Sequence, residues 1–88
     1  MALPLLSGGQ IVEVLAKRFG FVVVRQKGSH IVLSKVIVDR KIVTVVPKHR
    51  QVQRGTLRGV LKLAKITEEE FIKAIRKKDQ PIYRMVLN

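Results

Sequence analysis

Residues 21–33 read Phe-Val-Val-Val-Arg-Gln-Lys-Gly-Ser-His-Ile-Val-Leu. β-Branched residues flank a polar centre in this stretch, and such side chains pack well on the pleated surface of a sheet. The Gly28-Ser29 pair at the centre favours a tight turn, so the stretch predicts a β-hairpin. We expect its strands at residues 21–27 and 30–38.

A third strand follows the hairpin along the chain. Residues 41–46 are again rich in β-branched side chains, and Asp39-Arg40 before them predicts a turn. Pro47 ends the strand because proline has no N–H to donate to a central ladder. Since both connections are short, the three strands are expected to form an antiparallel meander.

Helical patterns lie on either side of the strands. Ser7 and Gln10 form a capping-box pair at the start of a helix expected at residues 8–19, and Gly20 suits its end. After the strands, apolar side chains at helical spacing predict a second helix that includes residues 57–64.

A last helix is expected to begin at a second capping box, Thr67 to Glu70, and to reach about residue 78. The order is therefore α-β-β-β-α, an α+β fold in which helices cover one face of a three-stranded antiparallel sheet. This is the layout of the double-stranded-RNA-binding domain. Residues 1–88 are expected to form a single domain with a core at about 7–72, and the role of the tail at residues 79–88 stays open.

Charge is the strongest signal in the composition. The chain has 18 Lys and Arg against 6 Asp and Glu, a formal net charge of +12. Such a field favours polyanions, with nucleic acid as the leading partner, an acidic protein second and an anionic membrane surface third. The absence of cysteine, of a signal-peptide pattern and of an apolar span favours a cytoplasmic protein that does not enter a membrane.

The hairpin also carries the best candidate for chemistry. His30 follows the turn directly and stands near the cations of Arg25 and Lys27. Cleavage of an RNA phosphodiester needs a base for the 2′-hydroxyl, an acid for the leaving oxygen and cations on the phosphate. His30 suits the acid–base role because imidazole titrates near neutral pH, and Arg25, Lys27 and Lys48 suit the phosphate. A lone histidine is, however, more often an ordinary surface or packing residue.

Other chemistries find little support in the sequence. The acids are scattered except for Glu68-Glu69-Glu70, whose position at a helix start already explains them. Two histidines without cysteine do not make a zinc site. Gly8-Gly9 lacks the Lys-Ser/Thr that follows a phosphate-binding loop. The sequence therefore predicts no metal site and no cofactor.

Several motifs taken together resemble the HicA-type mRNA interferase toxins. They are FVVVRQKGSH at residues 21–30, VTVVP at 43–47 with His49, GTLR at 55–58 and ITEEEF at 66–71. Their order and spacing agree with the family over roughly residues 7–72. One position departs from it, because many members have a second histidine directly after Gly-Ser-His, where this chain has Ile31.

The resemblance implies a double-stranded-RNA-binding-like fold and a metal-independent endoribonuclease. It also implies inhibition by a HicB-like antitoxin, in a toxin–antitoxin hetero-oligomer. The catalytic histidine of the family corresponds to His30, its glycine and serine to Gly28 and Ser29, and the histidine after the third strand to His49.

Three functions remain open at this point. The leading one is a type II toxin that cleaves mRNA. The RNA would reach His30 over the open sheet face and the basic loops. The second is a non-catalytic RNA-binding module of the same fold, which Ile31 in place of a second histidine would favour. The third is a component whose main task is to bind an acidic protein.

Overall fold

The structure, a computed structural model, describes residues 3–76. Its elements are α1 (Gly8–Phe19), β1 (Val22–Lys27), β2 (His30–Ile37), β3 (Arg40–Pro47), α2 (Arg54–Ala64) and α3 (Glu68–Ile75). The predicted α+β fold, like that of double-stranded-RNA-binding domains, is thereby confirmed. Helix α3 ends at Ile75, with Arg76 as its C-cap, so the prediction that it reaches about residue 78 is wrong. The tail at residues 79–88 lies outside the described residues.

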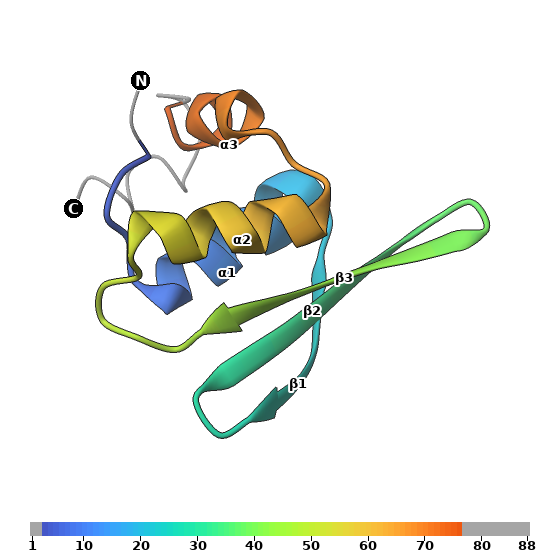
Figure 1. Ribbon diagram of the computed structural model, residues 1–88. Coiled ribbons are helices and arrows are strands. Elements are labelled where there is room, and N and C mark those ends of the chain that lie inside the picture. The colour runs from blue at the N-terminus through green and yellow to red at the C-terminus, as the bar shows by residue number, and fades with distance from the viewer. Residues whose placement is uncertain (1–2, 77–88) are drawn as a thin grey trace.

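The three strands form one antiparallel sheet in the order β1-β2-β3. The β2–β3 hairpin extends well beyond the helices (Figure 1). Its turn lies one residue earlier than predicted, because β3 already begins at Arg40 and Val38 takes the left-handed conformation with φ of 50°. The β1–β2 pairing shifts register between Val23 and Arg25, as at a β-bulge.

Both predicted capping boxes are present. The amide of Gln10 donates to the Ser7 hydroxyl over 3.1 Å, and the Ser7 amide donates to the Gln10 side chain over 2.9 Å. Thr67 and Glu70 make the same pair of bonds at the start of α3. Each box satisfies amides that the first helical turn leaves without a partner, which explains why α1 and α3 begin where the sequence predicts.

Helices α1 and α2 lie side by side on the same side of the sheet (Figure 1). Their apolar stripes meet the inward-facing strand residues in one core, to which Leu33, Val46 and Leu61 contribute. The hydroxyl of Thr44 donates to the carbonyl of Val60 over 2.8 Å inside this core, and so holds α2 against β3.

The segment before α1 also belongs to the core, which the sequence did not reveal. Leu3 and Leu6 are buried, and Leu6 forms an isolated antiparallel bridge with Val52 in the connection between β3 and α2. Within residues 3–76, none of the helices is long and apolar enough to cross a membrane.

Candidate functional site

The β1–β2 turn sets the position of His30. His30 is the first residue of β2 and lies opposite Lys27 of β1 on one side and Pro47 of β3 on the other. Gly28 has φ of +59°, a left-handed conformation that glycine adopts without a steric penalty. The Gln26 side chain donates to the Gly28 carbonyl over 3.2 Å and bridges the turn. The predicted hairpin is therefore confirmed.

The strand register shows which side chains share a face of the sheet. Residues directly opposite one another in an antiparallel pair point to the same side, so Lys27, His30 and Pro47 share one face. Arg25 lies opposite Val32, two residues beyond His30, and therefore shares that face too. The side chains of Arg25, Lys27 and His30 are all exposed, so two cations of β1 share the solvent-facing surface of the sheet with the imidazole.

The segment after β3 is tied to the same end of the sheet. The Lys48 amide donates to the carbonyl of Ser29, which fixes Lys48 beside the β1–β2 turn. The Gly8 amide donates to the carbonyl of His49 over 2.9 Å, which fixes His49 beside the start of α1. Both Lys48 and His49 are exposed. The structure thus brings together all the residues that the sequence singled out.

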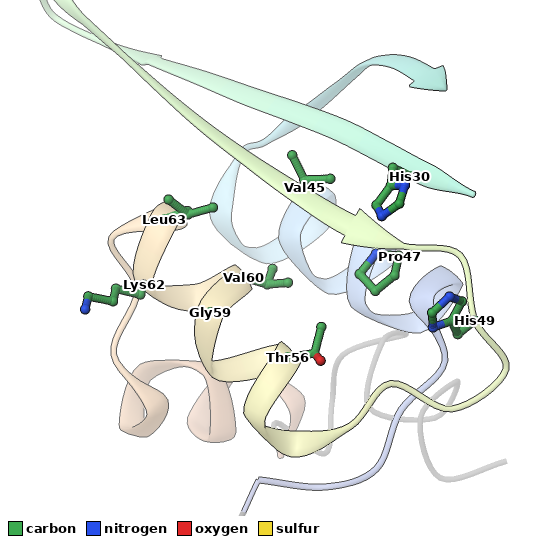
Figure 2. A pocket seen from close by; sticks show the side chains of 9 residues that line it. All are labelled: His30, Val45, Pro47, His49, Thr56, Gly59, Val60, Lys62 and Leu63. Carbon is green, nitrogen blue, oxygen red and sulfur yellow. The ribbon is translucent and has the colours of Figure 1, made fainter. Parts of the chain in front are cut away.

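A groove runs from this end of the sheet along the wall between β3 and α2. It has a volume of about 780 Å³ and is lined by His30, Val45, Pro47, His49, Thr56, Gly59, Val60, Lys62 and Leu63. Figure 2 shows His30, Pro47 and His49 together at one end, with Lys62 and Leu63 at the other. The two histidines therefore stand at the mouth of an elongated surface groove.

The groove and its surroundings are positively charged. None of its lining residues is acidic. The ion pairs found within residues 3–76 join Lys17 to Glu13 and Arg58 to Glu68, away from the β1–β2 turn. The charges of Arg25, Lys27 and Lys48 are accordingly not neutralised by an ion pair in the described part of the chain. In that part no three His, Asp or Glu side chains gather as metal ligands would.

Ile31 does not belong to this site. It is 8% exposed and lies opposite Val46, so its side chain packs into the core on the face away from His30. The α2 side of the groove, by contrast, was not predicted. The GTLR motif at residues 55–58 contributes to the resemblance, but it does not by itself indicate a groove-lining role.

Of three comparisons with known proteins, one found a match. One family model matches residues 8–66, and it describes the HicA toxin of bacterial toxin–antitoxin systems. The matched range contains all the candidate residues and runs from the start of α1 past the end of α2. No curated protein and no solved structure matches the chain.

Proposed function

Because the chain belongs to the HicA toxin family, we propose that it is the RNA-cleaving toxin, an mRNA interferase, of a type II toxin–antitoxin system. The observation that carries this proposal is the placement of His30. It is exposed at the mouth of the groove, and Arg25 and Lys27 share its face of the sheet. An imidazole that shares a sheet face with two cations and lies beside a groove suits acid–base chemistry on a phosphodiester.

The chemistry requires no metal ion. His30 removes the proton of a ribose 2′-hydroxyl, and the 2′-oxygen attacks the adjacent phosphorus. The bond from phosphorus to the 5′-oxygen of the next nucleotide breaks, and this oxygen takes a proton from a general acid. The products are a 2′,3′-cyclic phosphate and a 5′-hydroxyl. His49, at the same end of the groove, is the candidate for the acid.

The surrounding residues position and neutralise the substrate. Arg25, Lys27 and Lys48 offset the charge that builds up on the phosphate oxygens in the transition state. Gly28 and Ser29 make the turn that precedes His30, and the Ser29 carbonyl accepts a hydrogen bond from the backbone amide of Lys48. These residues come from β1, from β2 and from the two segments that connect the elements at this end of the sheet.

The same surface suits a protein inhibitor. A net charge of +12 attracts an acidic partner, and such a partner would block the reaction by covering His30. We assign this role to a HicB-like antitoxin.

The test is an RNA cleavage assay with EDTA present, using the wild-type protein and His30→Ala. General acid–base groups typically contribute about 10²- to 10⁴-fold in rate, so His30→Ala should lose at least that much. The labelled products should carry a 2′,3′-cyclic phosphate. Equal cleavage by both proteins, or loss of wild-type cleavage with EDTA, would contradict this chemistry.

The second candidate function is RNA binding without cleavage. The observation that favours it is the charge of the surface: Arg25, Lys27 and Lys48 are exposed and make no ion pair in the described part of the chain, and phosphate contacts alone would explain them. Tight binding of RNA that stays intact in the same assay would identify this function.

A further inference from the structure

One wall of the groove is a stripe along α2 with an unusual residue at its centre. Thr56, Gly59, Lys62 and Leu63 line the groove, and their spacing places them on one side of the helix. Gly59 lies in the middle of this stripe, opposite the strand wall that includes Val45 (Figure 2). The α2 wall therefore lacks a side chain at position 59, although the neighbouring Val60 also lines the groove.

Neither the backbone nor the packing explains a glycine at this position. Glycine is the least favourable residue in a helix interior apart from proline. Gly59 is not among the residues with a left-handed φ, and a Cβ added to it would meet nothing within 4 Å. Alanine would therefore fit and would favour the helix. What a side chain here would change is the space in the groove.

The lining of the groove suits a flat heterocycle. Val45, Pro47 and Leu63 offer apolar surface, and the Thr56 hydroxyl offers a hydrogen-bonding group. A nucleobase has apolar faces and a polar edge, so it matches both. The volume of about 780 Å³ falls within the range that holds single small ligands.

The charges indicate how a strand would run. At the end opposite the histidines, the side chain of Lys62 points outward from the groove (Figure 2). A backbone phosphate could meet Lys62 at that end while another lies beside His30 and Lys48. A duplex would present only phosphates and 2′-hydroxyls, because its bases are stacked inside. Only an unpaired strand can place a base between two such phosphate contacts.

We propose that the groove between α2 and β3 is a base-binding subsite for single-stranded RNA, which the absence of a side chain at Gly59 keeps open. The base of a nucleotide next to the phosphate at His30 lies against Val45, Gly59 and Leu63, and Lys62 contacts a phosphate further along the strand. The subsite rests on the proposed function for the nature of its ligand. An acidic peptide is the other class of ligand that the test must separate from RNA.

The experiment measures binding without cleavage. Every protein carries His30→Ala, and three fluorescent probes are used: a single-stranded RNA oligonucleotide, the same strand in a duplex, and an acidic peptide. Gly59→Leu fills the groove and should weaken single-strand binding about tenfold, the scale of one lost base contact. Duplex binding should change less than twofold, roughly the error of such an assay.

Gly55→Leu is the matched control. Gly55 is also exposed on α2, and a Cβ there also meets nothing within 4 Å, but Gly55 does not line the groove. It should leave binding of both probes unchanged. Both substitutions should raise the melting temperature, because leucine favours a helix far more than glycine does, so a loss of binding by Gly59→Leu would not reflect unfolding.

The outcomes separate the subsite from the proposed function. If the cleavage assay described above shows that wild-type protein leaves RNA intact, the proposed function fails, and the comparison of Gly59→Leu with Gly55→Leu in the His30→Ala background still tests the subsite. Equal effects of the two substitutions, or an equal loss for single strand and duplex, would overturn the subsite. So would a Gly59→Leu protein that keeps its RNA affinity and loses affinity for an acidic peptide.

Discussion

The backbone N–H of Gly8 donates a hydrogen bond of 2.9 Å to the carbonyl oxygen of His49, and so joins the first turn of α1 to the segment that follows β3. A Cβ on Gly8 would lie 2.1 Å from the carbonyl oxygen of Pro47 and 3.1 Å from the Cα of Lys48. No side chain fits in this contact. The start of α1 therefore fixes the position of Lys48 and His49 beside the β1–β2 turn.

Gly8→Ala is expected to displace residues of the site although Gly8 is not itself one of them. The added methyl group must push the Pro47–His49 segment away, and a displacement of about 1 Å at a catalytic group can cost about 100-fold in rate. Gly9→Ala is the control, since a Cβ there meets only the Ser7 hydroxyl oxygen at 3.9 Å. RNA cleavage and thermal melting should both fall for Gly8→Ala alone. Equal activity of the two variants would show that this contact does not position the site.

The exposed cations of the site should determine how RNA binding depends on salt. Each lysine that contacts a phosphate contributes about 0.7 to the slope of log K against log salt for a single strand. Lys27→Gln and Lys48→Gln should each lower this slope by about that amount. Lys73→Gln on α3 removes the same charge from an exposed position away from the groove and should leave the slope unchanged. An equal decrease of the slope for all three variants would indicate that only the overall positive charge of the protein matters, and not phosphate contacts at the site.

The fold could be predicted from the sequence because its signals are local. The two capping boxes, Gly20 at the end of α1 and Gly28 in the turn each act within a few residues, and the structure contains them all. The burial of Leu3 was not predicted, because it depends on contacts distant in the chain. The Arg54 side chain donates to the Leu3 carbonyl, 51 positions away in the sequence.

In the candidate site, too, the part that depends on local signals could be predicted and the part that depends on distant contacts could not. His30, Lys27 and Ser29 lie within one hairpin, so their proximity follows from the turn alone. The groove could not be predicted, because its two walls come from β3 and α2 and meet only through tertiary packing. Thr44 and Val60, which join these walls, are 16 positions apart, and neither residue type signals such a contact.

Ile31 should support stability and not cleavage. Its side chain is 8% exposed and packs into the core opposite Val46. Ile31→Val removes a buried methylene group and should lower the free energy of unfolding by about 1 kcal/mol. Ile37→Val makes the same change in the same strand, but Ile37 is 39% exposed, so the effect should be much smaller. Cleavage rates measured well below the melting temperature should match the wild type for both.

A drop in the catalytic rate constant for Ile31→Val, with Ile37→Val unchanged, would instead connect this core position to the chemistry at His30. Urea denaturation and single-turnover cleavage on the same preparations would separate the two effects.

The capping box of α3 should make stability depend on pH. The Thr67 backbone amide, and to a lesser extent its hydroxyl, lowers the pKa of Glu70 from its ordinary value of 4.5. A carboxyl group whose pKa is lower in the folded state stabilises the protein above its unfolded pKa, and this contribution is lost as the pH falls through the folded value. Glu70→Gln should therefore melt below the wild type at neutral pH, and the gap should close at acidic pH.

Glu69→Gln is the matched control for this pH dependence. It removes a carboxylate from the same helical turn and leaves the bonds between Thr67 and Glu70 in place. At neutral pH, the melting temperature of Glu69→Gln should lie closer to that of the wild type than the melting temperature of Glu70→Gln does. Thermal melting of the three proteins from neutral to acidic pH gives the answer, and a Glu70→Gln gap that stays constant with pH would refute the charge-based explanation.

The hydrogen bond between Thr44 and Val60 should set both the stability of the protein and the shape of the groove. Thr44 is fully buried, and valine keeps its size while removing the hydroxyl that binds the Val60 carbonyl over 2.8 Å. Thr44→Val should therefore lower the free energy of unfolding by about 1 kcal/mol, seen as a lower urea midpoint at unchanged slope. Thr56→Val removes a hydroxyl from an exposed position on α2 and should leave the midpoint nearly unchanged. If the bond also keeps the β3 and α2 walls of the groove at their spacing, Thr44→Val should weaken single-stranded RNA binding more than duplex binding. Equal urea midpoints for Thr44→Val and Thr56→Val would show that apolar packing alone fixes α2 on β3.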